Sequence, residues 1–487
     1  MNWPVDTLRP LCAAGLVLAY AGLCLAIGWG RLARVRATAR EARALATTAT
    51  GAPPLLVLFA SQTGYAERLA RQTAQALHAA GEPVRLLPLA AATAPVLRQA
   101  RKALLLLSTY GEGDAPDNGA AFLDTLARLP PVSDTSAATA ATAMAGSLGQ
   151  LHYGVLALGD SSFRHFCGFG RAADAALAAR GARPLFPRID MDRGAESALL
   201  QWQDALAQAT GTAVVGDWTA PAWEAWTFAG RRWLNPGSQG GPVFLVRIVP
   251  PAGTAPVWEA GDLVELCPPG GDGQLAEGEP AHPRDYSIAS LSTDGALELV
   301  VRRTVRADGS PGRVSGWLTA VALAGDPVPL RLRTNRNFRL GDNAARPLVL
   351  VGNGTGIAGL RGHLRARAAA GLGPNWLVFG ERQAAHDVLL GDEIAGWQAS
   401  GVLARVDLVF SRDGDGRNDG AARPYVQQRL REVGDTLRQW AADGAAVYVC
   451  GSLAGMAPGV DAALREVLGT DTVDALAAQG RYRRDVY

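Results

Sequence analysis

The sequence has very little lysine and very little cysteine. Among its 487 residues Lys102 is the only lysine, and the five cysteines stand far apart, at positions 12, 24, 167, 267 and 450. An odd, unclustered set of this size predicts neither a disulfide framework nor a metal site such as zinc. Acidic and basic residues nearly cancel, to a net charge of +2, so nucleic acid is not an indicated partner.

Hydrophobic residues, by contrast, make up 48% of the chain. That fraction, together with modest charge, is typical of folded protein. At about 100–200 residues per domain, the chain has room for about three domains.

An uncharged run, Leu11–Gly30, lies near the N-terminus and is followed by a cluster of arginines. A run of this length can cross a bilayer as a helix, and the positive-inside rule puts the arginines in the cytoplasm. A buried core helix is the alternative. We predict a transmembrane anchor (11–30) and a tether over residues 1–54. The chain would cross the inner (cell) membrane once, with its N-terminus outside and its catalytic domains cytoplasmic.

Apolar runs alternate with helical patterns over residues 55–210. The runs expected as strands are Leu55–Ala60, Val84–Leu87, Ala103–Ser108, Tyr153–Leu158 and Arg183–Phe186. Helices are expected at Ala66–Ala80, Gly168–Arg180 and Ala195–Gln208. This order predicts an α/β domain with a doubly wound parallel sheet, which binds ligands at the carboxyl ends of its strands.

Three unusual loops stand at the expected carboxyl ends of those strands. The first, Ser61–Glu67 (SQTGYAE), opens a helix and has hydroxyls but no Lys or Arg, which suits a monophosphate held by neutral donors. The second, Ser108–Asn118, and the third, Leu158–Cys167, each supply an aromatic ring and glycine. For the first loop alone, an ordinary capped strand–helix turn is the alternative.

In this order the three loops resemble those of flavodoxins and of the FMN domains of diflavin reductases. The resemblance implies a flavodoxin-like FMN domain over residues 55–210, in which Tyr110 and Phe163 flank the isoalloxazine ring. The family often has Tyr in place of Phe163. The implied FMN-binding residues are Ser61, Gln62, Thr63, Gly64, Ala66, Ser108, Thr109, Tyr110, Gly111, Gly113, Leu158, Gly159, Asp160, Phe163, Phe166 and Cys167. For Cys167, packing in the core is the alternative.

From about residue 220 short β-type runs are separated by Gly/Pro turns, a pattern typical of an antiparallel barrel. The runs are Trp223–Phe228, Val243–Val249, Asp262–Leu266, Asp285–Ile288, Ala296–Arg303 and Pro327–Leu332. Arg284–Ser290 (RDYSIAS) and Gly312–Leu318 (GRVSGWL) together resemble the FAD-binding barrel of ferredoxin–NADP reductases, although either alone could be structural. The resemblance implies an antiparallel β-barrel FAD domain over residues 220–344. The implied FAD-binding residues are Arg284, Tyr286, Ser287, Gly312, Val314, Ser315 and Tyr487.

The last part, residues 345–487, returns to alternating strands and helices, as in an α/β NADP-binding domain. Gly352–Ala358 (GNGTGIA) follows an apolar strand, and its glycines would let a pyrophosphate reach the next helix. Later arginines favour NADPH over NADH, because a guanidinium fork binds two phosphate oxygens. Merely solvated arginines are the alternative. The NADP-binding residues implied by the reductase resemblance are Gly354, Thr355, Gly356, Glu381, Arg382, Ser411, Arg412, Arg423, Tyr425, Gln427 and Cys450.

Ser287, Cys450 and Asp485 match the residues that surround the reacting flavin and nicotinamide atoms in diflavin reductases. Tyr487, the last residue, is implied to cover the FAD ring and completes the implied catalytic set. In such enzymes the flavin carries the reaction, while the protein orients and polarises it. For Cys450, packing at a strand end is the alternative.

The resemblance covers about residues 55–487 and points to the diflavin reductase family, which includes NADPH–cytochrome P450 reductase and sulfite reductase flavoprotein alpha-component. Only Pro268–Arg284 stands where those proteins have a connecting domain, so we predict a form without one. The implied function is electron transfer from NADPH through FAD and FMN to a protein acceptor. The anchor favours a membrane acceptor of the b-haem or ferric-chelate reductase type. The alternatives are a flavoprotein subunit of a sulfite reductase or cytochrome P450-type system, or an electron-transfer subunit active only in a complex.

Overall fold

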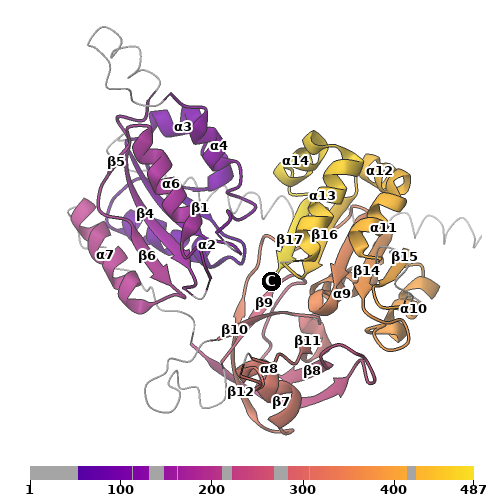
Figure 1. The fold of residues 1–487 in the computed structure, drawn as a ribbon. Helices are drawn as coiled ribbons and strands as arrows, with labels where there is room; N and C mark the ends of the chain where they lie inside the picture. The colour runs from indigo at the N-terminus through magenta and orange to yellow at the C-terminus, as the bar shows by residue number, and fades with distance from the viewer. Residues whose placement is uncertain are drawn as a thin grey trace, which may run out of the picture. The chain divides into compact units, whose positions relative to one another are not determined.

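The computed structural model of the chain shows two compact units, one with an N-terminal sheet and one with a barrel and a C-terminal sheet (Figure 1). The structure describes residues 53–111, 113–130, 147–161, 163–210, 222–267, 283–306, 308–413, 424–453 and 455–487.

The sheet of the first unit has strand order β2-β1-β3-β4-β5, with β6 also paired to β4, and all its pairs are parallel. Its strands are β1 (Leu55–Ala60), β2 (Val84–Pro88), β3 (Lys102–Ser108), β4 (His152–Gly159), β5 (Arg183–Pro184) and β6 (Ile189–Asp192). Every residue of β1 is buried, as expected for a central strand covered on both faces. The chain winds one way from β1 to β2 and the other way from β3 onward, which places the switch point between β1 and β3.

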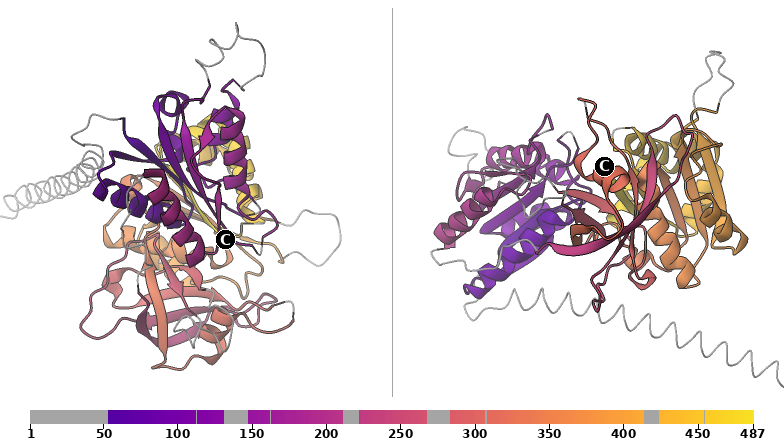
Figure 2. Two further views of the ribbon diagram at one scale, coloured as in Figure 1. Left: turned by 90° about the vertical axis from the view of Figure 1, so that its left-hand side faces the viewer. Right: turned by 90° about the horizontal axis from the view of Figure 1, so that it is seen from below.

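Helices cover both faces of this sheet (Figure 2). They are α2 (Tyr65–Ala79), α3 (Ala94–Gln99), α4 (Phe122–Ala127), α6 (Gly168–Ala179) and α7 (Glu196–Thr210), with a 3₁₀ turn η1 (Leu89–Ala91). The buried indole of Trp202 on α7 donates to the Thr73 hydroxyl on α2 over 3.1 Å, so these two helices pack together. Gly170 on α6 lies against Ala157 of β4, where a side chain would not fit, so this helix approaches its strand closely.

The barrel has strand order β10-β9-β12-β7-β8-β11, with every pair antiparallel. Its elements are β7 (Glu224–Trp233), β8 (Val243–Val249), β9 (Leu263–Leu266), β10 (Arg284–Ser287), η2 (Ser292–Asp294), β11 (Leu297–Arg302), α8 (Arg313–Gly316), η3 (Trp317–Val321), β12 (Pro327–Arg333) and η4 (Gly341–Asn343). A bridge between Ile288 and Leu299 joins the two edge strands. Closure of this kind leaves alternate side chains inside, where Trp226, Phe228 and Trp258 are buried.

The C-terminal sheet is parallel, with strand order β15-β14-β13-β16-β17. Its elements are β13 (Leu348–Asn353), η5 (Gly354–Gly356), α9 (Ile357–Ala369), β14 (Asn375–Glu381), α10 (Gly391–Ala399), β15 (Leu403–Phe410), α11 (Val426–Glu432), α12 (Gly434–Ala442), β16 (Ala446–Gly451), α13 (Met456–Leu468), α14 (Thr470–Ala478) and β17 (Tyr482–Val486). Leu348 and Leu350 enter the core on one face, whereas Val349 and Val351 enter the core on the other. This alternation explains why β13 reads as a continuous apolar run.

A buried arginine joins the barrel to the C-terminal sheet. The Arg361 side chain on α9 is only 3% exposed, and it pairs with Glu393 at 2.8 Å and with Glu298 of β11 at 2.7 Å. It also donates to the carbonyl of Ala289 over 2.8 Å. Removing one partner from a buried ion pair costs about 3–5 kcal/mol. These contacts therefore hold the barrel edge and α9 in a defined arrangement.

The expected strands and helices lie close to their predicted bounds, although the short helices α3 and α4 were not predicted and three strands differ. β5 covers only two residues of the expected Arg183–Phe186, β7 continues to Trp233, and β6 was not predicted at all. The short polar sequence of β6, IDMD, lacks the apolar run on which the predictions relied. The predicted domain boundaries remain predictions.

The expected transmembrane helix requires correction. In the residues that the structure describes, no helix combines the length and apolar character needed to cross a membrane. We therefore retain neither a transmembrane helix in the fold class nor the inner-membrane placement that depended on it. The run 11–30 lies outside the described residues, as do tether residues 37–52, the linker 211–221 and residues 268–282.

Candidate flavin and nicotinamide sites

The three predicted FMN loops follow adjacent strands of the first sheet. Ala60 of β1 is paired in register with Leu107 of β3, and Ser108 with Leu158 of β4. Beyond these pairs, the backbone N–H of Thr109 donates to the carbonyl of Leu158 over 2.8 Å. The loops at 61–67, 108–118 and 158–167 therefore begin at one edge of the sheet, beside the switch point.

The first loop leads directly into α2 and is tied to the second loop. The Gln62 amide nitrogen donates to an Asp117 carboxylate oxygen over 3.2 Å, and the Asp117 backbone N–H donates to the Gln62 amide oxygen over 3.1 Å. Gly64 has φ +81°, a left-handed conformation that favours glycine. Ala66 follows as a buried residue in the first turn of α2.

The second loop is a tight turn. The backbone N–H of Asp114 donates to the Tyr110 carbonyl, and that of Tyr110 donates to the Asp114 carbonyl, over 2.8 and 2.9 Å. Gly111 and Gly113, both with positive φ, stand inside this turn. The buried hydroxyl of Thr109 has no hydrogen-bond partner among the described residues, which is consistent with a polar ligand at this edge.

The third loop separates an exposed ring from a buried thiol. Phe163 is 45% exposed, whereas Cys167 is fully buried in the left-handed region at φ +55°. The Cys167 thiol donates to the carbonyl of Ala157, and burial raises its pKa to about 12. A side chain at Gly159 would come within 2.8 Å of the Cys167 nitrogen. Cys167 therefore supports the loop from within.

Of the remaining predicted residues of this loop, Leu158 is buried, and Asp160 and Phe166 are half-buried. Asp160 lies 3.8 Å from Arg193, and Phe166 lies under the guanidinium of Arg171. The sheet edge thus carries the first-turn donors, the aromatic rings and the unpartnered hydroxyl that a flavin mononucleotide requires. The FMN-binding roles of the individual residues remain predictions.

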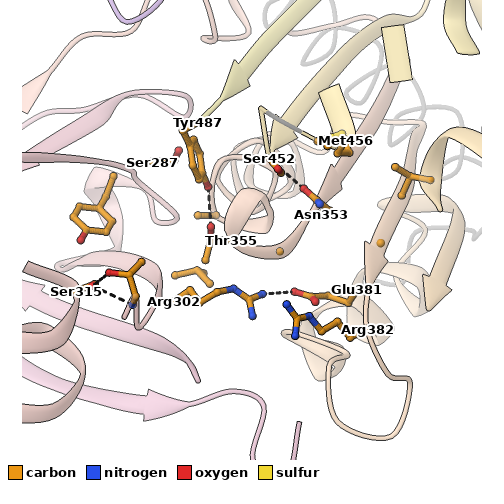
Figure 3. Close-up of a pocket in the computed structure, with 18 of the residues that line it drawn as sticks. Ser287, Arg302, Ser315, Asn353, Thr355, Glu381, Arg382, Ser452, Met456 and Tyr487 are labelled. Atoms are coloured by element: carbon orange, nitrogen blue, oxygen red, sulfur yellow. Dashed lines mark hydrogen bonds and ion pairs between the residues drawn. The ribbon is translucent and has the colours of Figure 1, made fainter. Parts of the chain in front are cut away.

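The second unit contains a cavity of about 1180 Å³ between the barrel and the carboxyl edge of the C-terminal sheet (Figure 3). Ligand sites usually have volumes of about 300–1,000 Å³, so this cavity has room for a large dinucleotide. All seven predicted FAD-binding residues line it: Arg284, Tyr286, Ser287, Gly312, Val314, Ser315 and Tyr487. The residues that the resemblance implied thus come together in the structure from β10, the α8 turn and the C-terminus.

The charge of the cavity wall suits phosphate groups. Among the residues that the structure describes, five arginines and two acidic side chains line it: Arg284, Arg302, Arg306, Arg313 and Arg382, with Asp285 and Glu381. On the barrel side the Ser315 hydroxyl lies 2.7 Å from the Thr304 hydroxyl and accepts from the Thr304 backbone N–H over 3.3 Å. Arginine excess and hydroxyl donors together match the chemistry of the diphosphate groups in FAD and NADPH.

The glycine turn between β13 and α9 borders the same cavity. Gly354 and Thr355 line it, whereas Gly356 is buried beneath them. A side-chain carbon at Gly356 would lie 2.0 Å from the carbonyl oxygen of Cys450 on β16. Only glycine allows the turn to pass this close to the neighbouring strand.

The other predicted NADP-binding residues are partly brought together. Among them, Ser411, Arg412, Arg423 and Tyr425 are the ones that the resemblance implies for a 2′-phosphate pocket. Glu381, Arg382, Ser411, Tyr425 and Gln427 line the cavity. Arg412 is exposed and is not among the lining residues, although its backbone N–H donates to the carbonyl of Arg382 over 2.7 Å. Arg423 lies outside the described residues. The NADP-binding roles therefore remain predictions.

Three of the predicted hydride-transfer residues form one cluster, in which Ser287 lines the cavity and Cys450 and Asp485 are buried. The Ser287 hydroxyl donates to Asp485 over 2.8 Å, and the Cys450 thiol lies 3.8 Å from the same carboxylate oxygen. Burial raises the pKa of Asp485 to about 6, although the Ser287 hydrogen bond opposes the shift. Burial also raises the pKa of Cys450, which keeps it a neutral thiol at neutral pH. A proton donor and a carboxylate thus face the place where charge would develop.

The C-terminal ring of Tyr487 covers this cluster. The ring is 55% exposed, and its hydroxyl donates to the Thr355 hydroxyl over 3.2 Å (Figure 3). Tyr487, the residue predicted to cover the FAD ring, is therefore in direct contact with Thr355, which lies in the turn predicted to bind the nicotinamide dinucleotide.

Several lining residues were missed by sequence reasoning. They include Arg302, Thr304, Asn353, Ser452 and Met456. Asn353 accepts the backbone N–H of Ser452 over 2.9 Å and so links the loops after β13 and β16. It is the second residue of the Gly352–Ala358 motif, a position that could have drawn attention to it. Arg302 carried no signal, because it only begins a run of three polar residues, Arg302–Thr304, that matches no motif.

Comparisons with known proteins agree with this geometry. Residues 57–202 match the family model for flavodoxin, and residues 350–462 match the oxidoreductase NAD-binding domain. The chain is 31% identical to the sulfite reductase [NADPH] flavoprotein alpha-component of Thiocapsa roseopersicina, over 85% of this chain and 83% of the relative. It is 26% identical to the protein of that name from Shewanella sp. (strain MR-7), over 90% of each chain. The corresponding protein of Bacillus subtilis (strain 168) is 25% identical, over 88% of this chain and 89% of the relative.

Proposed function

Since the chain belongs to the diflavin reductase family, and is an NADPH-dependent flavoprotein oxidoreductase that uses FMN, FAD and NADPH, we propose that it is the flavoprotein component of a sulfite reductase-type system. In that role it passes electrons from NADPH through FAD and FMN to a hemoprotein partner. The names of its relatives favour this function over the membrane b-haem or ferric-chelate reductase expected from the sequence. That expectation depended on the transmembrane helix and is not retained.

The observation that carries the proposal is the pairing of two separate sites on one chain. The flavodoxin-like sheet has three loops at its edge, and the second unit has a basic cavity lined by Ser287, whose hydroxyl joins the buried cluster with Cys450 and Asp485. A bound flavin can accept a hydride and return electrons one at a time. A chain that passed electrons from FAD directly to its acceptor would not need the FMN site of the first sheet.

The protein's own residues would divide the work as follows. The cavity arginines bind the phosphates of FAD and NADPH, and Ser287 and Asp485 orient and polarise the hydride-transfer site. The buried carboxylate, with its pKa at about 6, is mostly ionised at neutral pH and can stabilise positive charge on a nicotinamide. Tyr487 excludes water from the site until the nicotinamide displaces it.

The test reconstitutes the purified chain with a sulfite reductase hemoprotein component and measures NADPH-driven sulfide formation. We expect extraction to yield roughly equal FMN and FAD, a preference for NADPH over NADH, and sulfide production that requires both proteins. Turnover with ferricyanide but none with the hemoprotein would exclude the sulfite reductase assignment. It would point instead to another hemoprotein, such as one of the cytochrome P450 type. No turnover with any acceptor until the hemoprotein is added would indicate a subunit active only in a complex.

A matched variant tests the electron path. Thr63→Glu places a negative charge in the predicted phosphate loop, so the protein should lose FMN and retain FAD. We expect the variant to keep ferricyanide reduction and to lose hemoprotein reduction. Hemoprotein reduction by an FMN-free variant would contradict the proposed order of carriers.

A further inference from the structure

An ion pair outside the predicted binding set lies against the glycine turn of the cavity. Arg302, at the end of barrel strand β11, donates to the Glu381 carboxylate at the end of β14 over 2.8 Å (Figure 3). The Arg302 side chain is 27% exposed, whereas that of Glu381 is only 5% exposed. Both residues line the cavity, but the arginine is the more exposed of the two.

The position of the pair relative to the turn is well defined. A side-chain carbon at Gly354 would lie 3.5 Å from Arg302 Nη2 and 3.8 Å from Glu381 Oε1. On the other side, a side-chain carbon at Gly240 would lie 3.2 Å from Arg302 Nη1. The guanidinium therefore lies between two glycines, where no side chain separates it from the turn.

The charges at this point raise a difficulty for an anionic ligand. Glycine turns of this kind, between a strand and a helix, let a dinucleotide diphosphate approach the backbone. A carboxylate beside the turn would repel that diphosphate. Burial already raises the pKa of Glu381, and Arg302 is the nearest charge that opposes this shift. Arg302 cancels the negative charge where a phosphate would be placed.

Arg302 also retains donors for a ligand. A guanidinium has five N–H donors. Here Nη1 donates to the carbonyl of Gly241 over 3.1 Å and Nη2 donates to Glu381. These two bonds hold the group in one orientation, because both acceptors belong to backbone or to a buried side chain. Its other N–H groups are available to a ligand in the cavity.

We propose that Arg302 is a nucleotide-binding residue that binds the diphosphate of the nicotinamide dinucleotide, and that Glu381 is its counter-ion and positions it rather than contacting the nucleotide. This changes the role predicted for Glu381 from the sequence. It also assigns part of the nicotinamide site to the barrel, which was expected to hold FAD alone.

The proposal predicts a distinction between two ligands. NADP⁺ has both a 2′-phosphate and a diphosphate, whereas 2′-AMP has the 2′-phosphate without the diphosphate. Calorimetric titration of the FAD-replete protein with each ligand therefore separates the two subsites. For Arg302→Met we expect NADP⁺ to bind about tenfold or more weakly, in line with loss of a charge-assisted hydrogen bond. Binding of 2′-AMP should stay within about twofold, because neither group of the ion pair would touch it.

Further variants separate direct binding from loss of folding. Glu381→Gln keeps an acceptor for Arg302 and removes the negative charge, so NADP⁺ should bind as tightly as in the wild type or more tightly. The double variant Arg302→Met/Glu381→Gln should regain a substantial part of the affinity lost in Arg302→Met, because no uncompensated carboxylate remains. Ser411→Ala, in the predicted 2′-phosphate pocket, is the matched control and should weaken both ligands alike. Retained FAD absorbance verifies that each variant is folded.

Three outcomes would overturn the proposal. They are unchanged NADP⁺ binding in Arg302→Met, equal loss of NADP⁺ and 2′-AMP, or a double variant no better than Arg302→Met. The inference rests on the NADPH dependence within the proposed function. Because the titration uses no electron acceptor, its failure leaves the hemoprotein assignment intact, and failure of that assignment leaves the titration valid.

Discussion

Replacing Asp485 with Asn should slow hydride transfer and at the same time stabilise the protein at neutral pH. The carboxylate is 6% exposed and its pKa is raised to about 6, against an ordinary value of 3.8. A shift of that size corresponds to about 3 kcal/mol, the free energy spent on holding a charge in a poorly solvated site. Asn keeps an acceptor for Ser287 and removes the charge.

The sign of the pH dependence follows from linkage. Because the folded-state pKa of Asp485 is above its unfolded value, the folded state binds this proton more tightly. The corresponding stability is fully present below pH about 3.8 and is lost as the pH rises through about 6. The variant has no such loss. It should therefore match the wild type in acid and exceed it at pH 7–8 by about 3 kcal/mol, or roughly 5 °C in the unfolding midpoint.

Catalysis should change in the opposite direction. Loss of a preorganised charge at the reacting centre typically costs about 10²-fold or more in rate. Stopped-flow measurement of flavin reduction by NADPH, in a single turnover without acceptor, isolates this step. The wild-type rate should rise with pH through about 6, where Asp485 ionises, and the rate of the variant should be flat over that range. A variant with a wild-type rate, or one less stable than the wild type at pH 8, would refute the reasoning.

Three further predictions concern other parts of the second unit. Asp407→Asn should act in the opposite sense on stability: this buried carboxylate accepts hydrogen bonds from two arginines and an indole, which together outweigh the effect of burial and lower its pKa. We expect the free energy of unfolding, measured with denaturant at pH 7, to fall by about 3 kcal/mol, and this difference from the wild type should shrink as the pH falls below 3.8. The hydride-transfer rate should be unchanged. A variant more stable than the wild type would contradict this prediction. Gly356→Ala should cost about 1–3 kcal/mol or prevent folding, because the new methyl group would lie 2.0 Å from the Cys450 carbonyl; unaltered thermal unfolding would show that the turn is not tightly packed. Tyr487→Ala should let NADP⁺ bind about tenfold more tightly by calorimetry, because binding no longer has to displace the ring and its bond to Thr355; weaker binding would instead make the ring part of the site.

Local patterns predicted most strands and several helices, because buried elements have recognisable runs or periodicities of apolar residues. The run Leu55–Ala60 was expected as a strand and has those bounds in the structure, and all of its residues are buried. The same reasoning located the glycine turn before α9 and the Arg284–Ser287 strand. It failed for β6, where a half-buried edge strand has no apolar run, and for the transmembrane helix, which was inferred from an apolar run followed by arginines.

The tertiary structure decided which of these segments share a site. Ser287 and Asp485 are 198 residues apart in the chain, and only the packing of the barrel against the C-terminal sheet brings their side chains to 2.8 Å. Their grouping was available beforehand only through resemblance to a family. Arg302 and Glu381 had no such precedent in the sequence. An ion pair between two strands of different sheets has no periodicity or spacing of its own, because its geometry exists only after both sheets have packed.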